Sequence, residues 1–281
     1  MEKKVSIDLV LKLNTLFREK NWFSIENHDF VFESICNMSE ILSKEENNLI
    51  LELIERYNWV TYNDYSVKLK KILQQIVSIC DNKISKIYFF PIIKPEDEDK
   101  NKSGNSISYM LKCLKPSIKE ASKISIVELT KFESINSAKL TLKADELVIL
   151  VDDYVGSGET LQATLTEIRK NKSINNNNLI IASIAIQKDT ITKLLKQKLT
   201  IIYDEAVIKG ISQYYDSPIK EKNIQTMLEI EKKLISGRNF SLGYEESEAI
   251  VTMLRTPDNT FPVFWHNYKK STNLNPPFPR E

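Results

Sequence analysis

Apolar residues follow two different patterns along this chain, and the patterns divide it into three regions. Apolar positions recur at helical spacing through residues 1–82 and again from about residue 220. The region between them contains continuous apolar runs of strand length, which are typical of strands buried on both faces of a sheet. We therefore predict an N-terminal helical region at residues 1–82, a core of strands and helices at 83–216, and a C-terminal helical or wrapping region at 217–281.

The core region contains five predicted strands with helical segments between them. We expect the strands at residues 87–92, 124–129, 147–151, 179–186 and 199–203. Because strands alternate with helices, the predicted fold class is α/β, with a mainly parallel sheet that has helices on both faces. Ligands of such sheets bind at the carboxyl ends of the strands.

The N-terminal region carries packing patterns rather than chemistry. Ser43 and Glu46 have the spacing of a capping box, which predicts that a helix begins after Ser43. A second amphipathic pattern predicts a helix from about Tyr65 to Ile79. We interpret this region as a helical packing and interaction layer.

The third predicted strand leads into the most informative segment of the chain. Its apolar run ends in two carboxylates, Asp152 and Asp153. The polar loop that follows contains Gly156, Ser157, Gly158, Glu159 and Thr160. Glycine lets the backbone come close to a ligand, and the N-terminus of the next helix favours an anion. The carboxylates would repel a phosphate but would accept hydrogen bonds from sugar hydroxyls attached to it. The segment therefore predicts a sugar-phosphate ligand, and the alternative is a strand, a turn and a helix that bind nothing.

This order of strand, acid pair, glycine loop and helix resembles the signature of the type I phosphoribosyltransferases. The resemblance implies the ligand 5-phosphoribosyl-1-pyrophosphate (PRPP) and, with it, Mg²⁺ as a cofactor. Asp152 and Asp153 would be the catalytic pair and would hold the ribose 2- and 3-hydroxyls, while the loop from Gly156 to Thr160 would hold the 5-phosphate. The resemblance implies the sheet of that family, here with N- and C-terminal helical additions.

A second candidate phosphate site follows the first predicted strand. Lys102, Ser103 and Gly104 precede a helix predicted at residues 106–114, where the type I phosphoribosyltransferases have their pyrophosphate loop. A small residue there lets backbone amides face the pyrophosphate, and a lysine adds positive charge. The acidic run at residues 96–99 would repel this ligand unless it points away or helps to hold Mg²⁺. The alternative is a solvated surface loop.

Two further segments are candidates by their place in the chain alone. The polar segment at residues 131–142 lies where the same family has a flexible loop that closes over the reaction. Its candidate residues are Lys131, Glu133, Ser134 and Asn136. Tyr214, Tyr215 and Asp216 follow the fifth strand, where the family has its contacts to the base. An ordinary exposed loop explains the four candidates of the 131–142 segment, Lys131 included, equally well.

Residues 256–265 resemble the C-terminal part of a family of phosphoribosyltransferase-like proteins of bacterial conflict systems. A Thr-Pro-Asn-Asn-Thr-x-Pro-x-Phe-Trp pattern recurs in that family, and Asp258 replaces its first Asn here. The resemblance implies an anti-phage defence system with protein partners, of which a reverse transcriptase with its RNA is one example.

The same C-terminal segment allows two physical interpretations. A turn between its two prolines would project Arg255 and Asn259 into a cleft over the sheet. Alternatively, its aromatic residues would fill the core; these are Phe261, Phe264 and Trp265. The sequence favours neither.

Composition narrows the class of protein. The chain has 281 residues, 42% of them hydrophobic, and Lys+Arg 39 against Asp+Glu 38 leave a net charge of +1. This balance does not indicate direct binding of nucleic acid or membrane, and no apolar run approaches the roughly 20 residues that span a bilayer. Three separated cysteines without a CxxC pattern or a signal segment indicate the cytoplasm. With only two histidines, His28 and His266, we predict no set of metal-ligating residues.

These observations lead to one preferred function and two alternatives. The preferred one is a toxic effector of an anti-phage system, a transferase of the pentosyl (glycosyltransferase) class that binds Mg-PRPP or a nucleotide and cleaves or transfers at ribose C1. The first alternative is a catalytically inactive PRPP-binding, nucleotide-binding or scaffold protein. The second is a housekeeping nucleobase phosphoribosyltransferase, although Gly156 stands where the 6-oxopurine enzymes have an aspartate that serves the base. The acceptor substrate, the oligomeric state and the activating partner stay open.

Overall fold

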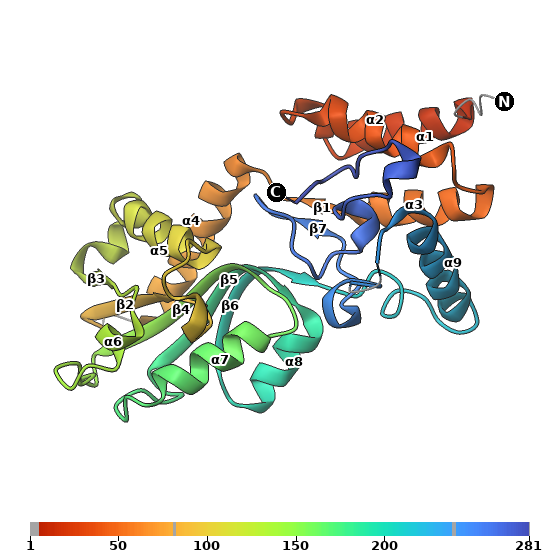
Figure 1. The fold of residues 1–281 in the computed structure, drawn as a ribbon. Helices are drawn as coiled ribbons and strands as arrows, with labels where there is room; N and C mark the ends of the chain where they lie inside the picture. The colour runs from red at the N-terminus through yellow and green to blue at the C-terminus, as the bar shows by residue number, and fades with distance from the viewer. Residues whose placement is uncertain (1–5, 81–82, 238–239, 281) are drawn as a thin grey trace. The chain divides into compact units, whose positions relative to one another are not determined.

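The computed structural model describes residues 6–80, 83–237 and 240–280, and the chain forms two compact units (Figure 1). Residues 62–207 form the first, which we call the sheet unit, and residues 1–61 and 208–281 form the second, the terminal unit. This division differs from the predicted boundaries at residues 82 and 216. The two ends of the chain pack together, and the helix that ends at Cys80 belongs to the sheet unit.

The sheet unit is built on five parallel strands in the order β3-β2-β4-β5-β6. The strands are β2 Lys86–Pro91, β3 Ser125–Glu128, β4 Glu146–Val155, β5 Leu179–Gln187 and β6 Thr200–Val207. They confirm the predicted mainly parallel sheet. β4 lies at the centre, and its residues from Leu147 to Val151 are at most 7% exposed. The continuous apolar run in the sequence therefore reflects burial on both faces.

Helices cover both faces of this sheet (Figure 1). α4 (Tyr62–Cys80) and α5 (Ser103–Leu114) lie on one face, and α7 (Glu159–Ile168) and α8 (Lys188–Lys196) lie on the other. Val148 and Leu150 of β4 share a core with Leu161 of α7 and with residues of the short helix α6 (Phe132–Ile135). Because strand residues alternate between faces, their neighbours in β4 point toward α4 and α5.

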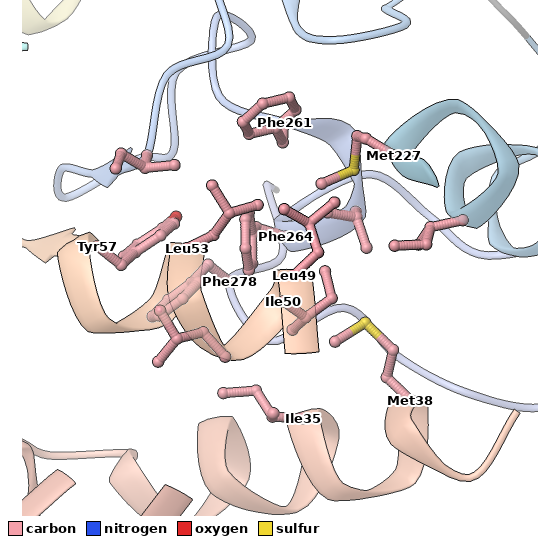
Figure 2. Packing of buried hydrophobic residues seen from close by; sticks show 14 of the residues in the cluster. Ile35, Met38, Leu49, Ile50, Leu53, Tyr57, Met227, Phe261, Phe264 and Phe278 are labelled. Atoms are coloured by element: carbon pink, nitrogen blue, oxygen red, sulfur yellow. The ribbon is translucent and has the colours of Figure 1, made fainter. Parts of the chain in front are cut away.

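The terminal unit is mainly helical, and both ends of the chain contribute to its core (Figure 2). Its helices are α1 Ile7–Glu19, α2 His28–Ser39, α3 Lys44–Arg56 and α9 Ile219–Leu234, and β1 (Asn58–Trp59) pairs in parallel with β7 (Val251–Thr252). Figure 2 shows Ile35, Leu49 and Leu53 of the first segment in one cluster with Met227 and Phe264 of the second. The two segments therefore share a single core.

The C-terminal segment uses its aromatic residues for packing. Phe261 and Phe264 are fully buried, and Trp265 is 7% exposed. Asn259 is buried as well, and its Nδ2 donates a hydrogen bond to Ser247 Oγ at 2.8 Å. Of the two interpretations of this segment, the structure favours core packing.

Two further features of the structure are the length and apolar character of its helices and the state of its cysteines. Within the described ranges, no helix is long and apolar enough to cross a membrane. The cysteines Cys36, Cys80 and Cys113 are free thiols. Burial raises the pKa of Cys36 and of Cys80 to about 11, so both thiols stay protonated and unreactive at neutral pH.

Candidate functional site

The strand order creates a switch point between β2 and β4. The chain leaves β2 toward β3 on one side, and it leaves β4 toward β5 on the other. Ligands of open α/β sheets bind at the carboxyl ends of the strands at such a point. The segments at residues 102–104 and 152–160 follow or end these two strands, so the topology brings together the two segments that the sequence singles out.

Asp152 and Asp153 lie near the carboxyl end of β4, and hydrogen bonds from two helices hold them. Asp152 Oδ1 accepts hydrogen bonds from Ser103 Oγ in α5 at 2.6 Å and from the backbone N of Asp153 at 2.9 Å. Asp153 Oδ2 accepts one from the hydroxyl of Tyr65 in α4 at 2.7 Å. Burial and the nearby charge of Asp153 raise the pKa of Asp152 well above its ordinary value, against the effect of the Ser103 hydrogen bond. The raised pKa means that the ionised form of Asp152 is disfavoured, and a cation or a hydrogen-bond donor beside the pair would favour that form.

The loop after β4 begins α7 with a glycine that the backbone requires. Gly158 is the N-cap of α7 and has a left-handed φ of 88°, which favours glycine. Thr190 fixes the loop from the α8 side, because its hydroxyl donates to the carbonyl O of Gly156 at 2.6 Å. Ser157 Oγ lies 3.4 Å from the backbone N of Glu159. The loop is thus a supported turn that leads into a helix N-terminus, the local structure that binds phosphate groups.

Glu159 forms an ion pair at this loop. Its Oε1 lies 2.6 Å from Nζ of Lys94, which follows β2. Both side chains are partly exposed, so the pair contributes little to stability. It does offset the negative charge that Glu159 would otherwise place beside a phosphate. Thr160, the next residue, is partly exposed in the first turn of the helix.

Ser103 and Gly104 belong to the first turn of α5, and the prediction of a loop there with a helix from residue 106 was wrong. A Cβ on Gly104 would lie 2.9 Å from the carbonyl O of Val151 and 3.1 Å from the backbone N of Ile92. Only glycine lets the helix start this close to β2 and β4. This close approach brings the Ser103 hydroxyl to Asp152. The N-cap residue Lys102 extends instead to Asp97, with 3.0 Å between Nζ and Oδ2.

The acidic run after β2 is matched by lysines. Besides the pair between Asp97 and Lys102, Glu98 and Asp99 both form ion pairs with Lys131. These contacts neutralise most of the repulsion that the run would direct at an anionic ligand. They also engage the first residue of the segment predicted as a flexible loop.

That segment, residues 131–142, is partly helical. α6 buries Phe132 and Ile135, and Nδ2 of Asn136 donates to the carbonyl O of Glu167 at 3.2 Å. Asn136 therefore links α6 to α7. Glu133 and Ser134 are exposed on the same short helix and stay candidates by position.

The tyrosines after β6 contact Arg56 and Glu52 of the terminal unit. The guanidinium of Arg56 lies 3.5 Å from the ring centroid of Tyr214, and its Nη2 donates to Tyr215 Oη at 3.3 Å. Tyr215 in turn donates to Glu52. Asp216 is exposed. A contact of these residues with a base stays a prediction.

The carboxylate oxygens of Asp152 and Asp153 suit Mg²⁺ that is already bound to a pyrophosphate. Carboxylate oxygens are the protein ligands that Mg²⁺ prefers, and Asp152 and Asp153 supply them. Among the residues that the structure describes, no group of three or more His, Cys, Asp or Glu side chains forms a metal site. Mg²⁺ would therefore take most of its ligands from a pyrophosphate and water.

The sequence did not indicate a role in this site for three residues that contact it: Tyr65, Lys94 and Thr190. Tyr65 and Thr190 lie in the buried faces of α4 and α8, where they look like packing residues. Lys94 is one lysine of many after a strand. Tyr65 is the one exception, because a hydroxyl within an apolar stripe indicates a buried hydrogen bond. The sequence does not indicate that its acceptor is Asp153.

Comparison with known proteins gives one match to a family. The model of the PRTase-CE family matches residues 36–280 of this chain. None of the curated proteins matches the sequence significantly.

Some solved structures show a distant likeness to this chain. The hypoxanthine-guanine phosphoribosyltransferase of Schistosoma mansoni, in complex with IMP, is 10% identical over 52% of this chain and 65% of its own, with a TM-score of 0.32. A hypothetical protein from Neisseria gonorrhoeae with bound ppGpp is 13% identical over 60% of this chain and 96% of its own, with a TM-score of 0.35. The xanthine-guanine-hypoxanthine phosphoribosyltransferase of Helicobacter pylori is 13% identical over 60% and 98%, with a TM-score of 0.29.

Proposed function

Because the chain belongs to the PRTase-CE family, we propose that its switch-point site binds Mg-PRPP or a nucleotide and that the protein cleaves or transfers at ribose C1. One observation carries this proposal. Ser103 Oγ lies 2.6 Å from Asp152 Oδ1, so the first turn of α5 meets the acid pair that leads into the loop of α7. Two helix N-termini therefore flank two carboxylates, as a ligand with two phosphate groups on one sugar requires.

Each part of the ligand has a matching group in this arrangement. The 5-phosphate binds at the loop from Gly156 to Thr160, and the pyrophosphate binds at the α5 N-terminus beside Lys102. The carboxylates between them accept hydrogen bonds from the ribose hydroxyls. Bound Mg²⁺ supplies charge neutralisation for the pyrophosphate.

The reaction that such a site supports begins with cleavage of the bond between ribose C1 and the pyrophosphate oxygen. The electron pair leaves with pyrophosphate, and positive charge develops on the ribose. Asp152 and Asp153 hold the sugar in place and offer negative charge near it, which favours the transition state. A water molecule or an acceptor then forms the new bond to C1 and gives up a proton.

The biological part of the proposal is an effector of an anti-phage defence system in the cytoplasm, with protein partners such as a reverse transcriptase and its RNA. Its support is the likeness of residues 256–265 to proteins of bacterial conflict systems. The helical terminal unit, which the chemistry does not require, is the natural place for partners.

A second candidate is a protein that binds PRPP or a nucleotide without turnover. The burial of Asp153, which is 8% exposed, and the raised pKa of Asp152 favour it, because both limit the negative charge available to a transition state. A housekeeping role with a free base is the third, and it predicts base-dependent release of pyrophosphate.

Phosphorus NMR of the protein with PRPP and Mg²⁺, with and without nucleobases, separates these candidates. We expect pyrophosphate release by the wild type and loss of release in the Asp152→Asn/Asp153→Asn double variant. Broadened PRPP signals without release support the binding protein, and release only in the presence of a base supports the housekeeping enzyme. Unbroadened signals at high protein concentration contradict the proposal for the isolated chain.

A further inference from the structure

Tyr65 is buried, yet its hydroxyl reaches the acid pair. It is 2% exposed, and its Oη donates to Asp153 Oδ2 at 2.7 Å across a sequence separation of 88 residues. From this contact we propose that Tyr65 is a positioning residue, which holds the Asp153 carboxylate in the orientation that accepts a ribose hydroxyl. This inference rests on the proposed function and adds a residue to the same site.

α4 fixes the place of Tyr65 on the sheet. The next residues of its buried face, Leu69, Ile72 and Leu73, are at most 1% exposed. Their side chains fill the core of the sheet unit, so the helix cannot move along the sheet without opening that core. The hydroxyl is therefore a donor with a set position.

An ion pair one turn later holds the same part of the helix. Lys68 Nζ lies 2.7 Å from Asp204 Oδ2, and it also pairs with Glu205; both acids are in β6. Burial lowers the pKa of Lys68, but its hydrogen bonds to the two acids outweigh this effect and raise the pKa above its ordinary value. The lysine stays charged at neutral pH, and it ties α4 to the carboxyl half of β6.

A donor in a set position determines where the rest of the Asp153 carboxylate points. The last torsion of an aspartate has a broad energy minimum, so the carboxylate rotates easily unless a hydrogen bond holds it. A hydrogen bond to a charged group is stronger than one between neutral groups. With Oδ2 held by Tyr65, the direction of Oδ1 is set before a ligand arrives, which lowers the entropy cost of binding.

Tyr65 and Ser103 have parallel but distinct roles. Each donates one hydrogen bond to one carboxylate of the pair, Tyr65 from α4 and Ser103 from α5. Ser103 is exposed and can contact a ligand directly, whereas Tyr65 is buried and reaches the ligand site through its hydrogen bond to Asp153. An effect of Tyr65 on binding must therefore depend on the ligand hydroxyl that Asp153 accepts.

The test uses the full-length chain and two matched variants. Tyr65→Phe removes the donor and keeps the ring. Tyr154→Phe is the control, because Tyr154 is 9% exposed and its Oη donates to Gln187 Oε1, also at 2.7 Å. Tyr65→Phe loses a buried hydrogen bond to a carboxylate, and Tyr154→Phe loses a buried hydrogen bond of the same length to an amide oxygen. Affinities for ribose 5-phosphate and for its 2-deoxy and 3-deoxy forms are measured by NMR titration, and thermal unfolding checks that each variant is folded.

We expect Tyr65→Phe to weaken binding of ribose 5-phosphate about tenfold, which corresponds to about 1.4 kcal/mol. One of the two deoxy sugars should bind Tyr65→Phe as well as it binds the wild type, because it lacks the hydroxyl that Asp153 accepts. Tyr154→Phe should bind all three sugars like the wild type. An equal loss for all three sugars, or no loss for any, overturns the positioning role.

Two results separate this inference from the function beneath it. If the wild type binds neither these sugars nor Mg-PRPP, the proposed function fails and the contact of Tyr65 is structural only. If Tyr65→Phe does not fold, Asp153→Asn tests the same hydrogen bond by changing its acceptor. That variant must then lose its discrimination between ribose 5-phosphate and one deoxy sugar, and unchanged discrimination overturns the inference.

Discussion

Ionised Asp152 lowers the stability of the folded protein, because its carboxyl group is buried next to Asp153. Burial and the charge of Asp153 raise its pKa above the ordinary value. The native protein therefore keeps the Asp152 proton to a higher pH than the unfolded chain does. Ionisation then favours unfolding, so the contribution of Asp152 to stability falls as the pH rises above about 4.

Asp152→Asn should consequently stabilise the protein at neutral pH. The amide keeps an oxygen that accepts from Ser103 but carries no charge, so we expect a higher free energy of unfolding at neutral pH. The gain should disappear near pH 4, where the wild-type carboxyl is protonated. Urea denaturation of both proteins at about pH 4, 5.5 and 7 measures it.

An aspartate with the opposite shift provides the control. The hydroxyl of Ser85 donates to Asp145 at 2.5 Å and lowers its pKa. Asp145→Asn should therefore lose stability at neutral pH and lose none in acid. If Asp152→Asn behaves like Asp145→Asn, the ionised Asp152 is stabilised by its surroundings, and our account of the acid pair is wrong.

At the scale of elements, local patterns were predictable and contacts between distant segments were not. The capping box is confirmed, since Ser43 N donates to Glu46 Oε2 at 2.7 Å and Glu46 N donates to Ser43 Oγ at 3.3 Å. The run that became β4 was equally clear. The start of α5 was missed because it depends on the space beside Gly104, which residues of other strands create. The acid pair could be found from its own segment, but its partner Tyr65 lies 88 residues away.

The end of α9 provides a prediction of its own. Glu231 is 5% exposed, and its Oε1 accepts a hydrogen bond from the backbone N of Leu242 at 3.0 Å, which joins the helix to the next segment. Burial raises its pKa from 4.5 to about 7, although hydrogen bonds from Leu242 and Ser241 oppose the shift. Because the folded-state pKa is the higher one, stability should fall as the pH rises from about 4.5 through about 7.

Glu231→Gln should remove this dependence. The amide oxygen still accepts from Leu242, and no charge has to be buried, so we expect the variant to be more stable by about 3 kcal/mol at pH 8 and unchanged at pH 4. Urea denaturation at the two pH values measures the difference. Glu229→Gln is the control, because Glu229 is exposed on the same helix and should change neither value. A gain of equal size at both pH values contradicts the assignment.

At the scale of the whole molecule, the sequence did not reveal which segments share a core. An amphipathic pattern shows that a helix has an apolar face but not what covers it. Residues 1–82 therefore looked like one helical region. The structure gives α4 to the sheet unit, where Leu69 and Ile76 are fully buried, and gives the preceding helices a core in common with residues 208–281.

This division predicts the result of shortening the chain. A protein that begins at residue 62 keeps the sheet unit and loses one side of the shared core, including Phe17, Ile35 and Leu53. Each such side chain contributes roughly 1.5–3 kcal/mol when buried, and a domain has about 5–15 kcal/mol in total. We therefore expect residues 208–281 to unfold in this variant while residues 62–207 stay folded. Limited proteolysis with mass spectrometry should find the new cleavage sites only after residue 207.

A chain that begins at residue 83 is the decisive comparison. It lacks α4 as well, so the sheet loses the cover that Leu69, Ile72 and Leu73 provide, and Asp153 loses the hydroxyl of Tyr65. Cleavage should then extend into β4 and β5. If proteolysis gives the same pattern for the two shortened chains, α4 does not support the sheet, and the first boundary lies at residue 82 after all. If it gives the two expected patterns, an interaction assay with the chain that starts at residue 62 tests the role of the terminal unit in partner binding while the candidate site stays intact.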